Sequence, residues 1–228
     1  MSLVYDRAAD LVRSIYDRRI VAPPVLDTGT YFAGTGAFLR NWRAIREEAL
    51  AVAQRLQSVP RFHEIMPEQE TISANDKRDW RMLILKAYGT EWRDNMAACP
   101  RLAEVVRSTP DVLSASLSFL APGKHIPAHR GPFRGILRFF LVLSMPLTQD
   151  GRPASALRIA DRQYRLHDGD CLLWDDTYEH EVWNDSDEVR IVLLLDVWRN
   201  GMPADMRFLS GLIVQVVRAG AWIRGFGG

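Results

Sequence analysis

The feature that most constrains the fold is a change of hydrophobic period near Asp111. Beyond it, apolar residues alternate with serines at Leu113, Ala115, Leu117 and Phe119. An alternation of period two is typical of a β-strand with one face buried. The second half of the chain is therefore expected to be built from strands whose two faces meet different surroundings.

Short apolar runs continue after this first strand, and turn signals such as Pro122-Gly123 and Asp168-Gly169 separate them. The further predicted strands lie around His125 and at 136–145, 156–159, 163–166, 171–174, 180–183 and 189–197. About eight short strands at this spacing, after a largely helical half, indicate a double-sheet jelly roll with helices packed outside. The predicted class is mainly β with a helical N-terminal part (α+β).

The first half of the chain has helical periodicity. Apolar residues at helical spacing predict helices at 3–18 and 36–56, and the polar, proline-containing stretch 57–79 predicts a long loop. An edge strand is expected at 80–88, then two short helices, and a last helix at 205–224. We expect a single domain over 1–228, with 1–110 as largely helical support, 111–199 as the jelly-roll core and 200–228 as a C-terminal helix.

Composition excludes several classes of function. The formal net charge is +1, which gives no global attraction to nucleic acid. The two cysteines, Cys99 and Cys171, are far apart, which argues against a disulfide framework and a thiolate zinc site. No stretch reaches the roughly 18 apolar residues of a transmembrane segment, so a cytoplasmic location is expected. The C-terminal helix could lie on a membrane surface, but its apolar face favours docking on the barrel.

Two histidine-bearing turns precede two strongly apolar runs. His125 and His129 come before one, and His180 comes before the other, whereas His63 and His167 lie in polar stretches and are expected to be exposed. Neutral imidazoles from two strands could hold a metal in the mouth of a barrel.

The usual ferrous oxygenase site adds a carboxylate two residues after the first histidine, but that position here is Gly131. The residues alone leave iron, zinc and no metal open.

Two arginines interrupt apolar strands. Arg190 precedes a run of aliphatic residues, and Arg138 lies within another. An unpaired buried guanidinium is costly, so each needs an anionic partner. That partner could be Asp196 or Asp170, or it could be a dicarboxylate co-substrate held by bidentate contacts.

The string Asp175-Asp176-Thr177-Tyr178-Glu179-His180-Glu181-Val182-Trp183, followed by Arg190, makes a distinctive combination. With His129-Arg130-Gly131-Pro132, Leu137-Arg138 and Asp196-Val197-Trp198, it resembles the aspartyl/asparaginyl β-hydroxylase family of iron- and 2-oxoglutarate-dependent dioxygenases. A weaker likeness covers 41–50. The stretch 80–89 is similar to the bacterial branch that includes the lipid A 2-hydroxylases.

The resemblance implies a double-stranded β-helix, cupin-like, that binds Fe(II), 2-oxoglutarate and O2. It assigns His129 and His180 as catalytic metal ligands, with water in the third protein position. It assigns Arg190 to the distal carboxylate of the co-substrate, and Arg138 and Ser118 to further co-substrate contacts. Phe140 stands where the family often has a histidine.

The function expected from the resemblance is hydroxylation of a C–H bond in an aspartyl or asparaginyl substrate, as a peptide or amino acid. The alternatives are hydroxylation of a lipid acyl chain, as in lipid A, and a non-catalytic jelly roll that binds a small carboxylate. A metal-dependent hydrolase or isomerase is a further rival. The expected partners are thus a small molecule, a peptide or a lipid, with no nucleic acid and no transmembrane segment.

Overall fold

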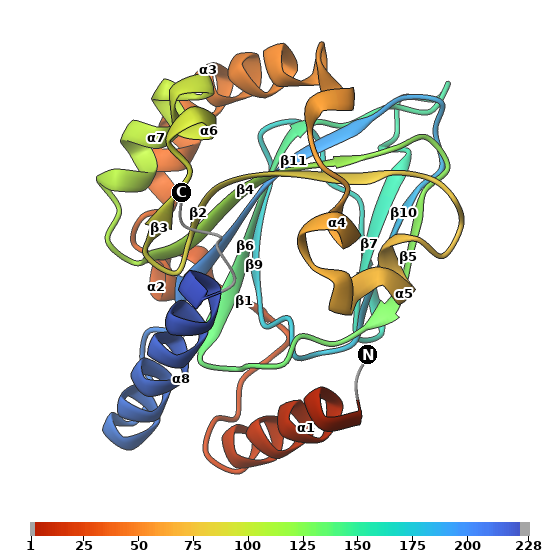
Figure 1. Cartoon of the computed structure of the whole chain (residues 1–228). Helices are drawn as coiled ribbons and strands as arrows, with labels where there is room; N and C mark the ends of the chain where they lie inside the picture. The colour runs from red at the N-terminus through yellow and green to blue at the C-terminus, as the bar shows by residue number, and fades with distance from the viewer. Residues whose placement is uncertain (1–2, 224–228) are drawn as a thin grey trace.

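The structure is a computed structural model that describes the backbone of residues 3–223 and the side chains of residues 10–218. Within this range the chain forms two antiparallel sheets that face each other, with helices outside them (Figure 1). The larger sheet has seven strands in the order β1-β9-β6-β11-β4-β2-β3, and the smaller has four in the order β5-β10-β7-β8.

The chain crosses between the two sheets repeatedly. The strands are β1 (Val25–Leu26), β2 (Trp80–Ala87), β3 (Thr90–Glu91), β4 (Val112–Leu120), β5 (His125–His129), β6 (Ile136–Ser144), β7 (Ser155–Ile159), β8 (Arg162–Tyr164), β9 (Cys171–Trp174), β10 (His180–Asn184) and β11 (Arg190–Trp198). From β4 onward, β4, β6, β9 and β11 join the larger sheet, and β5, β7, β8 and β10 join the smaller. This order is that of a double-stranded β-helix, so the predicted fold class is confirmed.

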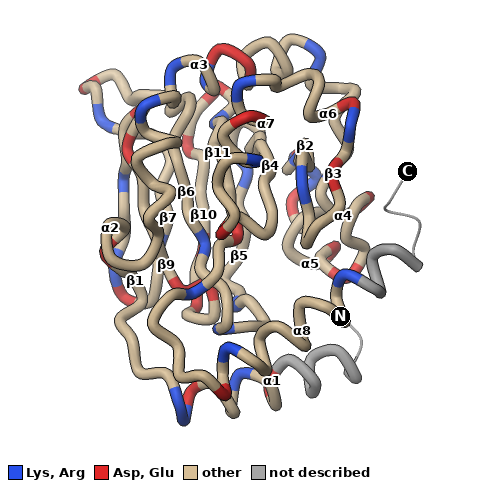
Figure 2. Tube along the Cα trace, turned by 90° about the vertical axis from the view of Figure 1, so that its left-hand side faces the viewer, with Lys and Arg blue, Asp and Glu red and all other residues tan. Residues whose placement is uncertain are grey.

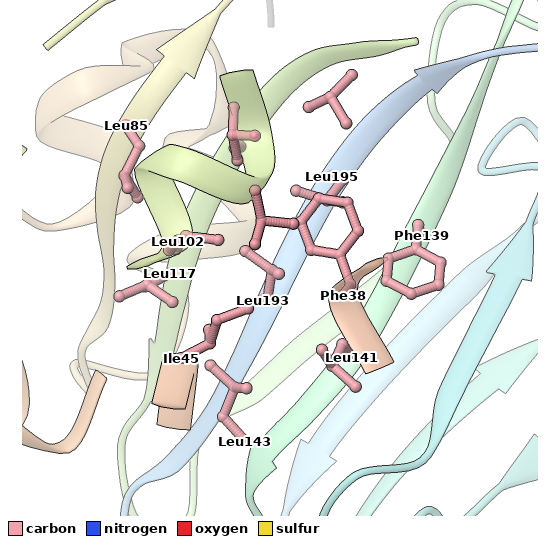
Figure 3. Packing of buried hydrophobic residues seen from close by; sticks show 14 of the residues in the cluster. Phe38, Ile45, Leu85, Leu102, Leu117, Phe139, Leu141, Leu143, Leu193 and Leu195 are labelled. Atoms are coloured by element: carbon pink, nitrogen blue, oxygen red, sulfur yellow. The ribbon is translucent and has the colours of Figure 1, made fainter. Parts of the chain in front are cut away.

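The long strands β4, β6 and β11 each have nine residues and two differently buried faces. Outward-facing residues such as Leu117, Phe139 and Leu193 form the main core with the helices that cover this sheet (Figure 3). On β11 the alternate residues include Val192 and Leu194, which pack with Phe140 in a separate cluster inside the barrel. The period of two therefore sends every second residue of these strands toward the site.

The helices occupy the outside of this frame. They are α1 (Leu3–Asp17), α2 (Thr28–Tyr31), α3 (Thr35–Ala53), α4 (Phe62–Ile65), α5 (Glu70–Ser73), α6 (Arg93–Ala98), α7 (Pro100–Arg107) and α8 (Ala204–Ile223), with short 3-10 turns at Leu56–Ser58 and Pro67–Gln69. Helices α3 and α7 cover the outer face of the larger sheet (Figures 1 and 3). The predicted helices at the start, at 36–56 and at the C-terminal end are confirmed to within a few residues; residue 224 lies outside the described residues.

Two expectations about secondary structure are wrong. The predicted loop 57–79 contains α4 and α5, whose Phe62 and Ile72 pack against the barrel interior cluster. Helices of one turn have too few apolar residues to show a period, which is why the sequence does not reveal them. The predicted edge strand is β2, but β3 pairs with its outer side, so β2 is not the edge.

Candidate metal centre

Two histidines meet inside the barrel. His129 ends β5 and His180 begins β10, and the two residues pair directly across these antiparallel strands of the smaller sheet. Their ring centroids are 4.1 Å apart. The folding of two turns that are distant in sequence thus brings the predicted ligands into contact.

The hydrogen bonds of the two rings fix which nitrogen is free. His129 Nδ1 lies 2.8 Å from the Pro127 carbonyl oxygen, and His180 Nδ1 lies 2.9 Å from the Tyr178 carbonyl oxygen. A carbonyl can only accept, so Nδ1 carries the hydrogen in both rings and Nε2 keeps its lone pair. Burial lowers the pKa of His129, and burial together with neighbouring His129 holds the pKa of His180 well below its usual value. Both rings are therefore neutral near pH 7 and suited to bind a metal through Nε2.

No carboxylate completes a protein triad. Among the described residues there is no cluster of three or more histidine, cysteine, aspartate or glutamate side chains able to hold a metal. At Gly131, where a carboxylate is usual, a Cβ atom would lie only 2.3 Å from Asp176 Oδ1. The glycine is thus required by the close approach of Asp176, whose carboxyl group is buried and has its pKa raised to about 6, chiefly by burial.

Arg138 is paired within the protein. Its Nη2 atom lies 2.9 Å from Asp196 Oδ1 and 3.3 Å from Asp176 Oδ2. Ser114 Oγ donates to Asp196 Oδ2 at 2.6 Å and so helps to hold this carboxylate. Asp196 was one of the two protein partners considered from the sequence, and it is the nearer of the two carboxylates that pair with Arg138. A buried Nε donor of Arg138 remains without a partner, so the predicted co-substrate contact stays a prediction.

Arg190 has no such partner. It is 3% exposed, its Nε atom is buried without a hydrogen-bond acceptor, and no described carboxylate forms an ion pair with it. Burial lowers the pKa of its guanidinium to about 9. The group lies over the Phe140 ring, 5.4 Å from its centroid, in a small pocket that Leu157, Tyr164 and Leu166 also line. An isolated guanidinium in an apolar pocket is the environment in which an anionic ligand gains most.

Two further polar groups lie in the interior. Trp80 Nε1 donates to Ser118 Oγ at 3.0 Å, which leaves the Ser118 hydroxyl hydrogen available for another acceptor. Trp174, which the sequence did not single out, stands edge-on to His180 with ring centroids 4.4 Å apart. Its buried Nε1 donor has no partner. Its position immediately before the paired aspartates is the one sequence signal that could have identified it.

The other three histidines lie outside this centre. His125 Nε2 is 2.6 Å from Glu181 Oε1 and its ring stacks on Trp183, while His167 is exposed as expected. His63 was expected to be exposed but is half-buried, because its Nδ1 atom is 3.1 Å from Ser73 Oγ. The structure brings together only the two histidines that were predicted as ligands.

Comparison with known proteins identifies the family of this chain. The sequence pattern described as Aspartyl/Asparaginyl beta-hydroxylase matches residues 39–200, most of the chain. The chain belongs to this family. The fold and the family expected from the sequence are both confirmed, and the family is one of hydroxylases that use Fe(II) and 2-oxoglutarate.

Individual relatives differ in what their names state. An "Ornithine lipid ester-linked acyl 2-hydroxylase" of Rhizobium tropici is 37% identical over 194 residues, which cover 85% of this chain and 66% of that protein. The human "Aspartyl/asparaginyl beta-hydroxylase" is 28% identical over 173 residues, covering 74% of this chain and 21% of the human protein. The chain therefore spans less than two thirds of the length of either relative.

Proposed function

We propose that this protein is an Fe(II)- and 2-oxoglutarate-dependent hydroxylase that oxidises a C–H bond in the acyl chain of a lipid. The observation that carries the proposal is the pair of neutral imidazoles with free Nε2 atoms in the same barrel interior as an unpartnered, buried Arg190. The two imidazoles suit a divalent metal, and the Arg190 guanidinium suits a carboxylate that must come from outside the protein.

Different residues would bind the metal and the co-substrate. His129 and His180 would hold the ferrous ion through Nε2, because their Nδ1 atoms are committed to backbone carbonyls. With O2 as the oxidant and 2-oxoglutarate as the co-substrate that is oxidised to succinate and carbon dioxide, iron bound there would supply the chemistry that no side chain can. Arg190 would bind the distal carboxylate of 2-oxoglutarate, with Ser118 and Arg138 as the further predicted contacts.

The part of the interior next to Arg190 has apolar walls. Leu172 and Leu194 face it and are only half-buried, whereas the outward-facing residues next to them, Leu173 and Leu193, are fully buried. Apolar walls exclude water from this part of the interior, and they are compatible with an aliphatic substrate nearby.

The choice of substrate changes from the first expectation. The sequence alone favoured an aspartyl or asparaginyl substrate, with a lipid acyl chain as the alternative. The relative at 37% identity is named for a lipid acyl chain, whereas the aspartyl/asparaginyl enzyme is at 28%. The comparison supports the alternative better, and we adopt it.

The test is succinate release from 2-oxoglutarate by the ferrous protein, measured with three additions. These are a diacyl or acyloxyacyl lipid dispersed in detergent, an aspartyl- or asparaginyl-containing peptide, and no prime substrate. We expect release above the background only with the lipid, together with a product heavier by one oxygen atom. Release with the peptide alone would restore the aspartyl/asparaginyl assignment. No succinate with any addition, despite tight carboxylate binding, would favour the non-catalytic alternative.

A further inference from the structure

Exposed apolar side chains gather on one part of this molecule. Among the described side chains, nine large hydrophobic residues are exposed, and seven of these lie on α1, just after it, or on α8. The seven are Leu11, Ile15, Val21, Phe208, Leu212, Val216 and Val217. We call them the helical apolar surface. Single exposed apolar residues are ordinary, but such a concentration marks a surface that is normally covered.

Helix α8 carries two apolar stripes at helical spacing. One stripe, with Met206 and Val214, is buried against α1 and the loop before β6, which confirms the expected docking of this helix on the body of the protein. The other stripe, Phe208, Leu212 and Val216, is 50–72% exposed. Docking on the barrel explains the first stripe and leaves the second without a structural role.

Helix α1 repeats this arrangement on a smaller scale. Tyr16 is fully buried, and its hydroxyl group lies 2.8 Å from Ser210 Oγ of α8. Leu11 and Ile15 are on a different side of α1 and are exposed, with exposed Arg18 at the next helical position. The two helices thus pack against each other, and each also has apolar side chains exposed to solvent.

These helices adjoin the loop that follows the first predicted metal ligand. Arg13 Nη1 of α1 donates to the Gly131 carbonyl at 3.1 Å, two residues after His129. Asp17 forms an ion pair with Arg134 at 2.8 Å, and a Cβ at Gly135 would lie 2.4 Å from Ser210 Oγ of α8. Figures 1 and 2 show α1 and α8 next to each other at one end of the molecule. The helical apolar surface therefore belongs to the end of the barrel that carries the histidine pair.

On the described parts of α1, α8 and the turn after α1, three arginines have no acidic partner. Each described acidic residue of the two helices, Asp10, Asp17 and Asp205, already pairs with an arginine. Arg18, Arg207 and Arg218 have no acidic partner among the described residues. Free cationic groups beside exposed apolar residues complement the anionic headgroups and acyl chains of a lipid bilayer.

We propose that the helical apolar surface docks this protein on an anionic lipid bilayer, so that the end of the barrel with His129 and His180 faces its lipid substrate. Of the described helices, none is long and apolar enough to cross a membrane. The choice of a lipid surface as partner rests on the proposed function. A second copy of the chain fits less well, because a two-fold contact would bring the same three arginines toward one another, while the described acids of the two helices already have arginine partners.

The experiment is co-sedimentation of the full chain with vesicles of phosphatidylcholine, with and without phosphatidylglycerol. We expect binding to the mixed vesicles that weakens in high salt and is much lower with phosphatidylcholine alone. The double variant Phe208→Ser/Leu212→Ser should reduce partitioning at least about tenfold. Arg207→Gln/Arg218→Gln should reduce it on the mixed vesicles only. The matched control is Leu147→Ser, which removes an equally exposed leucine elsewhere and should bind like the unchanged protein.

Several outcomes would overturn the docking proposal. These are no binding to anionic vesicles, unchanged binding by Phe208→Ser/Leu212→Ser, or an equal loss in Leu147→Ser. A dimer in sedimentation velocity that the double variant converts to monomer would assign the surface to a second copy. Because vesicle binding is measured without iron or 2-oxoglutarate, it is independent of catalysis. Vesicle binding without lipid-dependent succinate release would reject the proposed function and leave the docking proposal standing. Lipid-dependent succinate release without vesicle binding would reject the docking proposal and leave the proposed function standing.

Discussion

His129 and His180 lie opposite each other on neighbouring antiparallel strands, and each ring donates its Nδ1 hydrogen to the carbonyl two residues earlier in the chain. This shared local geometry fixes the same tautomer in both rings without help from any carboxylate. It leaves two Nε2 lone pairs in one place, and Asp176 occupies the space beside Gly131 that a third ligand would need. A metal held here by the protein alone therefore has two ligands.

Removing either imidazole should abolish turnover. We expect His129→Ala and His180→Ala to reduce succinate release below detection, because one remaining histidine cannot retain the metal. His125→Ala is the matched control, since this neighbouring histidine pairs with Glu181 outside the centre and should retain activity. Circular dichroism would verify that all three variants are folded. Substantial turnover in a folded His180→Ala protein would exclude the two-histidine site.

Arg190→Met should stabilise the ligand-free protein and weaken the binding of 2-oxoglutarate. In the absence of ligand the guanidinium is buried and unpaired, so its removal should raise the free energy of unfolding by about 1–3 kcal/mol. The same change should weaken 2-oxoglutarate binding by about 2–5 kcal/mol, because it removes the partner of a buried carboxylate. Urea unfolding and calorimetry measure the two effects. A variant that is less stable and binds 2-oxoglutarate normally would show that Arg190 has a structural role instead.

The stability gain of Arg190→Met should depend on pH. Burial lowers the pKa of Arg190 from its usual value to about 9 in the folded protein. A depressed pKa means that the folded state binds the proton less tightly than the unfolded state, so stability is lost as the pH falls from the usual pKa of arginine to about 9. The full penalty is present near neutral pH, and it shrinks above about pH 9. Unfolding of both proteins without ligand, near neutral pH and at about pH 10, should show a smaller difference at the higher pH. An equal difference at both would contradict the lowered pKa of Arg190.

Substitution of Gly131 should be harmful even without a charge. A Cβ atom there would lie 2.3 Å from the Asp176 carboxylate, which pairs with Arg138, and the Gly131 N–H donates to the Asp176 main-chain carbonyl at 2.7 Å. We expect Gly131→Ala to lower stability by about 1–3 kcal/mol, and Gly131→Asp to be worse, because it would add a second carboxylate beside Asp176. The control is Gly211→Ala in α8, where a Cβ meets nothing and helix propensity should make the change neutral or favourable. Equal melting temperatures for wild type and Gly131→Ala would contradict this account of the missing carboxylate.

The sequence predicts the main strands and helices of this protein because each has a characteristic hydrophobic period. The alternation from Leu113 to Phe119 is sufficient to predict β4 and the two faces of the barrel. The apolar sequence neighbours of Arg190 are enough to identify it as a candidate functional residue, because burying a guanidinium is costly. Both inferences depend on local patterns and on energies that hold in any fold.

What the sequence leaves open depends on contacts between distant residues. Arg138 and Arg190 look equivalent in sequence, yet only Arg138 lies opposite an acid, because the register of β6 and β11 places it beside Asp196. The need for glycine at 131 comes from the approach of Asp176. The two-residue strand β1 is too short to have a detectable period. Registers and close approaches of this kind are set by the whole fold and not by any single segment.

The central claim is that two histidines and one co-substrate share a metal, and ferrous binding measured by calorimetry without oxygen tests it most directly. Two ligands from the protein should give modest affinity for Fe(II) alone. Addition of 2-oxoglutarate should raise that affinity at least about tenfold, because the 2-oxo acid would coordinate the same metal ion and each would then strengthen the binding of the other. Arg190→Met should keep the affinity for Fe(II) alone and lose most of this increase. An Fe(II) affinity that is the same with and without 2-oxoglutarate would contradict the account.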